Sequence, residues 1–583
     1  MSKTLFWYIF WSLLKVFLMT TASLAGIMSL GGLLRPLTDN GLNLGQVNRM
    51  LAYLTPAMCT YSLPVAALFA ATTVYGRFAA DNELTAMRAC GISYLSARRF
   101  SIALPALVLG LVVAVASLLM LCFIVPLFSL KAQEVIYSNI GRLIVSRIER
   151  EHELDFPTGI GTNRFVVFAE EAHSIPPNPQ TPQVSRVELI GPAVVTYEPP
   201  VFPDPILTPK EFWMARTAIV NIARSGAEGG AALTVQLEDG IRFPREFYGG
   251  SQVGVAGTTF GPTPRQSLIG ENVKFMNVTR LTELAQDPGQ SERVQLVLRD
   301  MIRRDQELAY RAMIVKAFRP ESADASGHAI FDFGKDVDQG DRYQIGGHGV
   351  KAGAVGDEVI VGPLDKDLSK PFSAGPRFGW FEQMHGSQQI IQGDAGELRI
   401  STKPDLTGQQ IIISVELNDA ALHTQSGVSE RASFSRSFAV PMPPEIENMA
   451  KRTLADYLCD PNTGPGDAAL LRHEEAAANN AVRSELHSRA SFAVSCLSLV
   501  MIGCALGMMF RSGNFLNAFA VSFVPALLCI TLIVCGQQCA THVPDDVAPG
   551  YHDPLHLGLA FIWAGNISVT AAVIWLTIRL QRQ

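Results

Sequence analysis

Five residues between two apolar stretches have the types and spacing of a short contact helix. Glu83 stands where a negative charge favours the positive end of a helix dipole, and Arg88 stands near the opposite end. Leu84 and Met87 are three residues apart and therefore share one helical face. Gly91 is the residue type that most often ends a helix in the left-handed conformation. These residues predict a helix that binds a partner through two apolar side chains oriented by two charges.

A short amphipathic helix over residues 81–93 is also compatible with an ordinary connector at a membrane surface. No other motif supplies a chemical activity. The chain lacks a Gly-x-x-x-x-Gly-Lys-Ser/Thr loop for ATP phosphates, and His473-Glu474-Glu475 lacks the second histidine of a zinc-binding helix. It also lacks a basic stripe with interleaved aromatic residues for nucleic acid. We therefore predict no catalytic residue, no metal, no cofactor bound by this chain and no nucleic-acid partner.

The apolar residues are clustered in a way that predicts a membrane protein. The 583 residues are 48% hydrophobic and 17% charged. A helix that crosses a bilayer needs about 20 apolar residues. Six stretches reach that length with at most one charged side chain in each: Leu5–Leu34, Leu51–Gly76, Ser101–Leu130, Ala490–Phe510, Leu516–Val534 and Leu555–Ile578. The predicted fold class is a helical membrane protein with three spans, a large inserted domain and three further spans.

The positions of Lys and Arg predict that both termini are cytoplasmic, because cytoplasmic loops hold the excess of these residues. The short loops on the opposite side contain only two basic residues, Arg35 and Arg49. The loops and ends on the N-terminal side contain Lys3, Arg77, Arg88, Arg98, Arg99, Arg511, Arg579 and Arg582. This topology places Glu83–Ser93 in the cytoplasm and the inserted domain outside it.

The insertion, residues 131–488 between membrane parts 1–130 and 489–583, is predicted to be rich in β-structure. Short β-branched runs separated by Pro and Gly favour a sandwich or jelly roll. The runs are Arg164–Ala169, Arg186–Ile190, Ala193–Tyr197, Met214–Ile222 and Ala232–Leu237. Strand-like runs return over about 320–440, as a second small β unit or an elaboration of the first. Cys459 is the only cysteine of the insertion, so an internal disulfide framework is excluded.

Two helices are also predicted in the insertion. Apolar residues at helical spacing predict one over Ser291–Phe318. Asp467 then caps an alanine-rich segment that runs without a helix-breaking residue through Glu485 into the fourth span. The second helix is therefore expected to be continuous with a membrane span.

The segment Glu83-Leu84-Thr85-Ala86-Met87-Arg88-Ala89-Cys90-Gly91-Ile92-Ser93 resembles the cytoplasmic coupling segment of the LptF/LptG (YjgP/YjgQ) family of lipopolysaccharide-export permeases. The strand pair Phe212–Ile222 and Leu233–Gly240 resembles the outer-domain signature of that family. Glu485-Leu486-His487-Ser488-Arg489, at the entry to the fourth span, is similar to the family as well, and so is the layout of three plus three spans. The stretch from about 320 to 450 has no counterpart that we recognise.

The resemblance implies a permease subunit of an ABC-type exporter in the bacterial inner membrane. Such a subunit extracts lipopolysaccharide or a related lipid and passes it to a periplasmic LptC/LptA-like β bridge. It would pair with a second permease subunit, either a paralogue or another copy, and with a cytoplasmic LptB-like ATPase dimer that uses the ATP. Glu83, Leu84, Met87, Arg88 and Gly91 are then the expected ATPase-coupling residues, and this chain is not expected to be an enzyme.

Arg35 and Arg49 are the candidate lipid-binding residues, because a guanidinium group matches phosphate in a bidentate geometry. Ordinary interfacial anchoring is an equal alternative for Arg35. Members of the family often carry a basic residue about two turns earlier, where this chain has apolar residues and Ser29. A membrane-anchored periplasmic scaffold or mechanotransmission protein is the alternative function. Its usual layout, one span before the outer domain, differs from the three predicted here.

Overall fold

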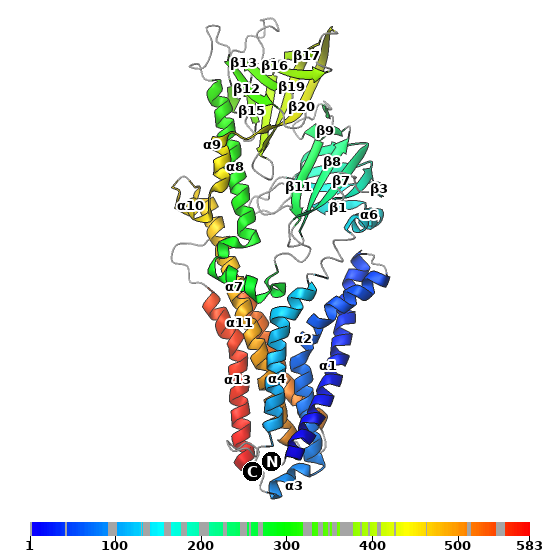
Figure 1. The fold of residues 1–583 in the computed structure, drawn as a ribbon, viewed down its shortest axis with the longest axis vertical. Helices are drawn as coiled ribbons and strands as arrows, with labels where there is room; N and C mark the ends of the chain where they lie inside the picture. The colour runs from blue at the N-terminus through cyan, green and yellow to red at the C-terminus, as the bar shows by residue number, and fades with distance from the viewer. Residues whose placement is uncertain are drawn as a thin grey trace. The chain divides into compact units, whose positions relative to one another are not determined.

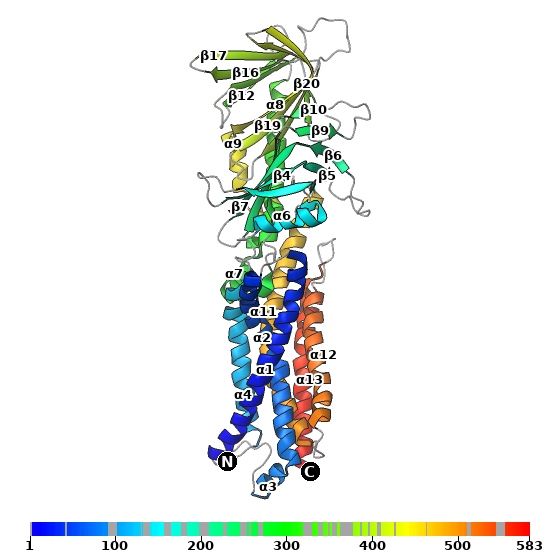
Figure 2. The ribbon, with the colours of Figure 1, turned by 90° about the vertical axis from the view of Figure 1, so that its right-hand side faces the viewer.

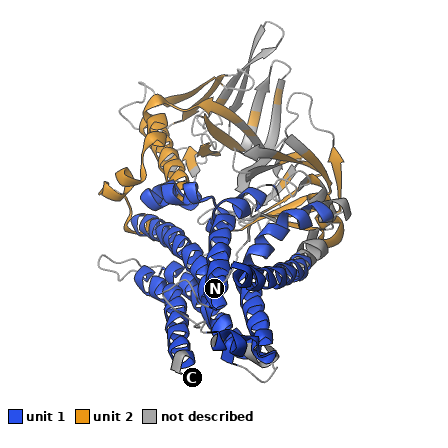
Figure 3. Ribbon diagram, turned by 60° about the horizontal axis from the view of Figure 1, so that its bottom comes forward, with its two compact units in different colours: residues 1–140, 266–294, 468–583 blue, residues 141–265, 295–467 orange. Residues whose placement is uncertain are grey.

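The computed structural model divides the chain into two compact units, which Figure 3 colours separately. Unit 1 comprises Met1–Ile140, Gln266–Val294 and Ala468–Gln583, and unit 2 comprises Gly141–Arg265 and Gln295–Asp467. The structure describes residues 3–40, 44–90, 102–129, 131, 140–156, 165–175, 184–197, 209–225, 230–238, 240–244, 253–255, 258–265, 272–318, 329–335, 342–347, 350–352, 358–361, 377–384, 387–394, 397–404, 410–424, 427–461, 463–509, 515–543 and 554–582.

Unit 1 contains the membrane spans, and the predicted arrangement of three plus three is confirmed. Among the described residues, six helices are long and apolar enough to cross a membrane. They lie side by side in Figures 1 and 2. Their elements are α1 (Lys3–Asn40), α2 (Leu44–Ala80), α4 (Leu104–Leu119) with its continuation to Ser129, α11 (Pro465–Met509), α12 (Phe515–Thr541) and α13 (Leu555–Arg582). The expected continuous helix from Asp467 into the fourth span is therefore confirmed as α11.

The third span contains a wide turn. After α4 comes a π-helix, η1 (Met120–Ile124), in which the Val125 amide donates to the Met120 carbonyl. Pro126 follows directly, and a proline ring crowds the carbonyl of the preceding turn and donates no hydrogen bond. The π turn therefore widens the helix at the place where proline disturbs regular α-helical bonding.

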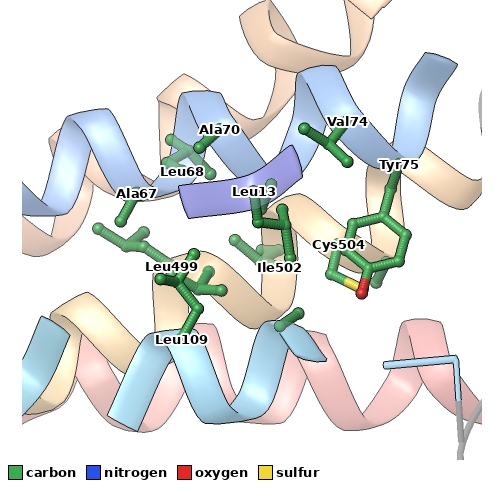
Figure 4. Packing of buried hydrophobic residues seen from close by; sticks show 14 of the residues in the cluster. Leu13, Ala67, Leu68, Ala70, Val74, Tyr75, Leu109, Leu499, Ile502 and Cys504 are labelled. Atoms are coloured by element: carbon green, nitrogen blue, oxygen red, sulfur yellow. The ribbon is translucent and has the colours of Figure 1, made fainter. Parts of the chain in front are cut away.

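The core of unit 1 lies mainly around α2 and α11. In their most apolar windows, 67% and 72% of residues are buried, against 28% to 33% in the other four spans. Figure 4 shows Ala67 and Leu68 on α2 near Leu499 and Ile502 on α11. Tyr75 is also buried in this core, and its hydroxyl donates to the Ile102 carbonyl at 2.9 Å. The outer four spans therefore present most of their apolar surface outward from this chain.

The helices α12 and α13 approach each other through glycine. A Cβ atom added to Gly558 would lie 2.6 Å from the Gly536 carbonyl oxygen and 2.6 Å from the Ala540 Cβ. A Cβ atom added to Gly536 would lie equally close to the Gly558 carbonyl oxygen, at 2.6 Å. Small residues permit this close contact of backbones in membrane helices.

Gly558→Ala is expected to destabilise unit 1, because the new methyl group meets backbone atoms that cannot move independently of the helix. Overpacking of this kind costs about 1–3 kcal/mol. The matched control is Gly26→Ala on α1, where an added Cβ meets no atom within 4 Å. Thermal unfolding of the purified full-length protein should show a lower midpoint for Gly558→Ala and not for Gly26→Ala. Equal midpoints would contradict the packing argument.

Unit 2 contains the inserted antiparallel sheets. Its first strands are β1 (Glu153–Phe156), β2 (Phe165–Phe168), β3 (Glu171–Ile175), β4 (Val184–Ile190), β5 (Ala193–Tyr197), β6 (Pro209–Met214), β7 (Thr217–Ser225), β8 (Gly230–Glu238), β9 (Gly240–Pro244), β10 (Val253–Val255) and β11 (Thr258–Arg265). They follow α6 (Ile140–Glu151). Within the described residues the strand orders are β1-β2-β5-β6-β9-β10 and β11-β8-β7-β4-β3, so successive strand pairs alternate between two sheets.

The alternation explains one wrong strand prediction. The run Met214–Ile222 is not a single strand, because β6 ends at Met214 and β7 begins at Thr217 in the other sheet. The Ala215 amide donates to the Pro192 carbonyl, and the Gly191 amide donates to the Arg216 carbonyl, both at 3.0 Å. The two connections between sheets therefore bind to each other. Gly191 has a φ of +61°, which a residue without a side chain adopts most easily.

A further sheet occupies the region for which the sequence left two alternatives. Its strands are β12 (Ala329–Lys335), β13 (Arg342–Gly347), β14 (Val350–Ala352), β15 (Glu358–Val361), β16 (Arg377–Met384), β17 (Ser387–Asp394), β18 (Glu397–Pro404), β19 (Gln410–Thr424) and β20 (Gly427–Pro441). In the described part of the chain these strands form one nine-stranded sheet separate from the first two. The region is therefore a β unit with its own core.

The core of this nine-stranded sheet packs against α8 (Glu292–Ala317), which agrees with the helix predicted over Ser291–Phe318. Tyr310 and Ile314 on α8 belong to the same buried cluster as Phe378 and Phe438 on the sheet. The chain then continues through α9 (Pro444–Glu447) and α10 (Leu454–Cys459) to α11.

Asp332 on β12 accepts several hydrogen bonds near the edge of this sheet. Arg342 Nε donates at 2.9 Å, the Gly334 amide at 2.9 Å and Gln344 Nε2 at 3.1 Å. Partial burial raises the pKa of Asp332. The hydrogen bonds from Arg342, Gly334 and Gln344, together with the Arg342 charge, lower the pKa by a larger amount, so it lies below its usual value. The ionised carboxylate is therefore the form that the folded sheet favours.

A lowered carboxyl pKa predicts a contribution to stability that is present above the unfolded-state pKa of about 4 and is lost as the pH falls through the lower folded-state pKa. Asp332→Asn should increase the rate of hydrogen exchange along the β12–β13 ladder at pH 7. The loss of local stability should not exceed about 1 kcal/mol, which is the upper range for an exposed ion pair. The difference from the unaltered protein should diminish as the pH falls below about 4. A difference that did not depend on pH would assign the effect to another cause.

Candidate functional site

The predicted contact helix is present as α3 (Glu83–Ala89). The helix α2 ends at Ala80, and Asn82 has a φ of +58°, a conformation that Asn tolerates better than most residues. The Asn82 carbonyl accepts the Ala86 amide at 3.1 Å, which is the first bond of the new helix. Figures 1 and 2 show α3 at the end of the membrane bundle where both termini lie. Asn82, in the left-handed conformation, therefore precedes the first residue of α3. The sequence predicted Gly91 as the residue that ends this helix.

The apolar face of α3 points toward its own chain. Leu84 is 4% exposed and Met87 is 8% exposed, and both belong to the hydrophobic cluster of unit 1 that contains Phe78 and Ala79 of α2. Leu84 and Met87 are therefore buried within this chain, and their role in coupling to an ATPase stays a prediction. Their spacing of three residues does place them on one face, but this face packs on the spans because burying it removes apolar surface from water.

The residues on the other side of α3 are exposed. We call Thr85, Ala86 and Ala89 the outer face of α3, because all three side chains are exposed. Glu83 is half-buried. The side chain of Arg88 and the whole of Gly91 lie outside the described residues, so the predicted roles of these two residues stay predictions.

The two candidate lipid-binding residues lie on different helices. Arg35 belongs to α1, and its side chain lies outside the described residues. Arg49 belongs to α2 and is exposed. A lipid-binding role for either residue stays a prediction.

A buried ion pair lies on α11, and the sequence did not predict it as part of a site. Glu485 and Arg489 have side chains that are 8% and 3% exposed, and Arg489 Nε donates to Glu485 Oε1 at 2.9 Å. Arg489 Nη2 donates to the Val273 carbonyl at 3.0 Å and to the Lys274 carbonyl at 3.1 Å. Gln537 Nε2 on α12 donates to Glu485 Oε2 at 2.8 Å. The pair therefore joins three parts of unit 1 that are distant in sequence.

The residues around this pair bind another span. On α11, the exposed His487 Nδ1 accepts from Trp563 Nε1 on α13 at 3.3 Å. Ser491 donates to the Ile562 carbonyl at 2.7 Å, and Asn566 Nδ2 donates to the Ser491 carbonyl at 2.7 Å. Residues 485–491 are therefore bonded to α12, to α13 and to the chain near residue 273.

One signal in the sequence could have identified the pair. Glu485 and Arg489 are four residues apart, which places opposite charges on one helical face, at the start of an apolar span. Charges buried at such a place need partners. The partners Val273 and Gln537, however, follow from no local sequence pattern.

The described residues contain no group of three or more His, Cys, Asp and Glu side chains that could hold a metal ion. The polar atoms of the Glu485–Arg489 pair are occupied by protein partners, apart from Arg489 Nη1, for which the described part of the chain provides none. The Glu485–Arg489 pair thus joins helices of unit 1 through hydrogen bonds.

The comparison with known families agrees with the sequence argument. Residues 7–142 match the model of the family described as lipopolysaccharide export system permease LptF/LptG. No curated protein matches the chain. The matched region contains the first three spans and α3. The resemblance to the LptF/LptG permeases is therefore confirmed over residues 7–142, where the chain is similar to that family.

Proposed function

We propose that this chain is a permease subunit of an ABC-type exporter that extracts lipopolysaccharide or a related lipid from the bacterial inner membrane. The observation that carries the proposal is the family match over residues 7–142, because it includes three spans and α3. The six apolar helices support a multi-pass protein. The positions of Lys and Arg favour an orientation with α3 in the cytoplasm and the sheets of unit 2 in the periplasm. The lipid would pass from these spans to a periplasmic LptC/LptA-like β bridge.

ATP hydrolysis would come from a cytoplasmic LptB-like ATPase dimer, since the sequence has no phosphate-binding loop. The outer face of α3 is the surface that we assign to this partner. Its small side chains, Thr85, Ala86 and Ala89, permit a close approach. Leu84 and Met87 would act from behind this face by anchoring α3 to the core of unit 1, so that a push on α3 reaches the spans.

A second permease subunit would cover part of the outward apolar surface of the peripheral spans. In their most apolar windows, only 28% of the residues of α1, α12 and α13 are buried within this chain. Exposed side chains such as Trp11, Val524 and Ile567 need either lipid or a neighbouring subunit in a membrane. Arg35 and Arg49 would contact lipid phosphate by bidentate hydrogen bonds.

The coupling role of α3 is tested by blocking its outer face without altering its inner face. Ala86→Trp and Ala89→Trp should leave the protein inserted and its thermal unfolding unchanged. They should reduce copurification of the ATPase at least tenfold, which corresponds to about 1.4 kcal/mol of binding free energy. ATP-dependent lipid release should fall with it. Ala86→Ser is the matched control and should behave as the unaltered protein does.

Leu84→Ala completes the coupling experiment. Because Leu84 is buried, Leu84→Ala should lower the unfolding temperature, in contrast to the tryptophan variants. The expected loss is about 2–5 kcal/mol of unfolding free energy. Full ATPase binding and lipid release in both tryptophan variants would overturn the assignment of α3 as the contact.

The proposed topology is tested with two exposed cysteines of the unaltered chain. Cys90 follows α3 and Cys459 ends α10, and both are exposed. In intact spheroplasts a membrane-impermeant maleimide should label Cys459 and leave Cys90 unlabelled until the membrane is permeabilised. Cys459→Ser and Cys90→Ser identify the two signals. Labelling of Cys90 in intact spheroplasts would show that the orientation is reversed.

A further inference from the structure

One face of α11 carries two kinds of contact with the chain segment that precedes α8. Val482, Glu485, Leu486 and Arg489 follow one another at intervals of three, one and three residues, which places them on a single helical face. The segment comprises η2 (Val273–Phe275), α7 (Val278–Gln286) and η3 (Pro288–Gln290), all within unit 1. Val482 and Leu486 on this face contact the cluster that contains Leu281 and Leu284 of α7, and Arg489 binds the backbone of η2.

The apolar part of the contact involves α7. Leu281 and Leu284 on α7 are buried in one cluster with Val482, and Leu486 packs against this cluster. The remaining side chains of α7 include the exposed Thr282 and Glu283, so α7 is amphipathic with its apolar side on α11. This contact by itself is less directional than a hydrogen bond.

The charged part of the contact fixes the position of η2. The Val273 and Lys274 carbonyls belong to this single helical turn, and the Val273 carbonyl also accepts the Met276 amide at 3.3 Å. Arg489 donates to both carbonyls through Nη2, at 3.0 and 3.1 Å, and thereby caps the turn with a positive charge. A guanidinium group held in this way sets one register between residues 273–274 and α11.

Glu485 has two roles in this arrangement because its two oxygens bind different partners. Oε1 accepts from Arg489 Nε, which orients the guanidinium group toward η2. Oε2 accepts from Gln537 Nε2, which lies on α12 directly after Gly536. Gln537 is half-buried and gives one bond, whereas Arg489 is almost fully buried and gives three. The polar link from the pair to α12 is therefore a single hydrogen bond at 2.8 Å, whereas Arg489 makes three.

We infer that the Glu485–Arg489 pair is a positioning element of the membrane unit: Arg489 fixes η2 and α7 to the fourth span, and Glu485 fixes the outer end of the fifth span through Gln537. Movement of α12 away from α11 must break the Gln537–Glu485 bond while the Arg489 bonds to η2 persist. In the exporter proposed above, and resting on that proposal, any transport step that separates α12 from α11 at Gln537 must break this bond.

The test measures hydrogen exchange of the full-length protein in lipid nanodiscs, at residues 273–286 and at residues 533–541. Gln537→Ala should accelerate exchange at least tenfold over 533–541 and leave 273–286 unchanged. Arg489→Met should have the opposite pattern. Glu485→Gln should accelerate exchange in both segments, because Glu485 connects them. Gln538→Ala and Arg483→Met are the matched controls, since both side chains are exposed neighbours of the altered ones.

An exchange of side chains separates positioning from general destabilisation. Gln537→Glu alone places two carboxylates together and should accelerate exchange over 533–541. The double variant Glu485→Gln/Gln537→Glu restores an amide opposite a carboxylate and should recover most of the protection there. Glu485→Leu/Arg489→Met removes both charges and should remain folded, yet it should lose the protection of residues 273–276. Equal exchange in the altered and control variants would overturn the inference.

Lipid release per ATP hydrolysed is the second readout, measured with the reconstituted transporter. Gln537→Ala should change this ratio at least twofold, and Gln538→Ala should not. An unchanged ratio together with the expected exchange pattern would limit the element to fixing structure and overturn its role in transport. If the unaltered protein released no lipid, the proposed function would fail while the exchange pattern still decided the positioning role.

Discussion

A charged side chain can be buried at the start of a membrane helix only if protein groups replace the water that it loses. Glu485 and Arg489 satisfy this condition by recruiting partners from outside α11. Val273 and Lys274 supply carbonyls, and Gln537 supplies an amide. The need to satisfy two charges therefore brings together three segments that are far apart in the chain. The part of unit 1 where α11 meets residues 273–274 and Gln537 depends on this requirement.

The membrane helices of this chain are joined in two further ways. Gly536 and Gly558 let α12 and α13 approach until their backbones touch, which leaves no room for a side chain between them. Asn566 and Ser491 join α13 to α11 by hydrogen bonds inside the bundle. Hydrogen bonds among polar side chains select one register, whereas glycine contacts bring the helices close. Together they give the last three spans defined relative positions.

The short helix α3 shows how burial changes the meaning of a sequence pattern. Glu83, Leu84 and Met87 correctly predicted a helix with one apolar face. The structure adds that Leu84 and Met87 pack into the core of their own chain. Two apolar side chains on a helix look alike whether they bind a partner or a neighbouring span. The outer face, with Thr85, Ala86 and Ala89, carries no strong sequence signal and is the surface left for a partner.

The membrane class, the six spans, the helix α3, the continuous helix α11 and the inserted β-structure could all be predicted from the amino-acid sequence. Each of these follows from local composition, periodicity or the absence of helix-breaking residues. The three-dimensional structure was needed to show that β6 and β7 belong to different sheets, that residues 329–441 form a separate sheet, and that Glu485 and Arg489 meet Gln537 and residues 273–274. These features depend on contacts between residues distant in the chain. A local pattern can show that a charge or an apolar face needs a partner, but it cannot show which distant segment provides one.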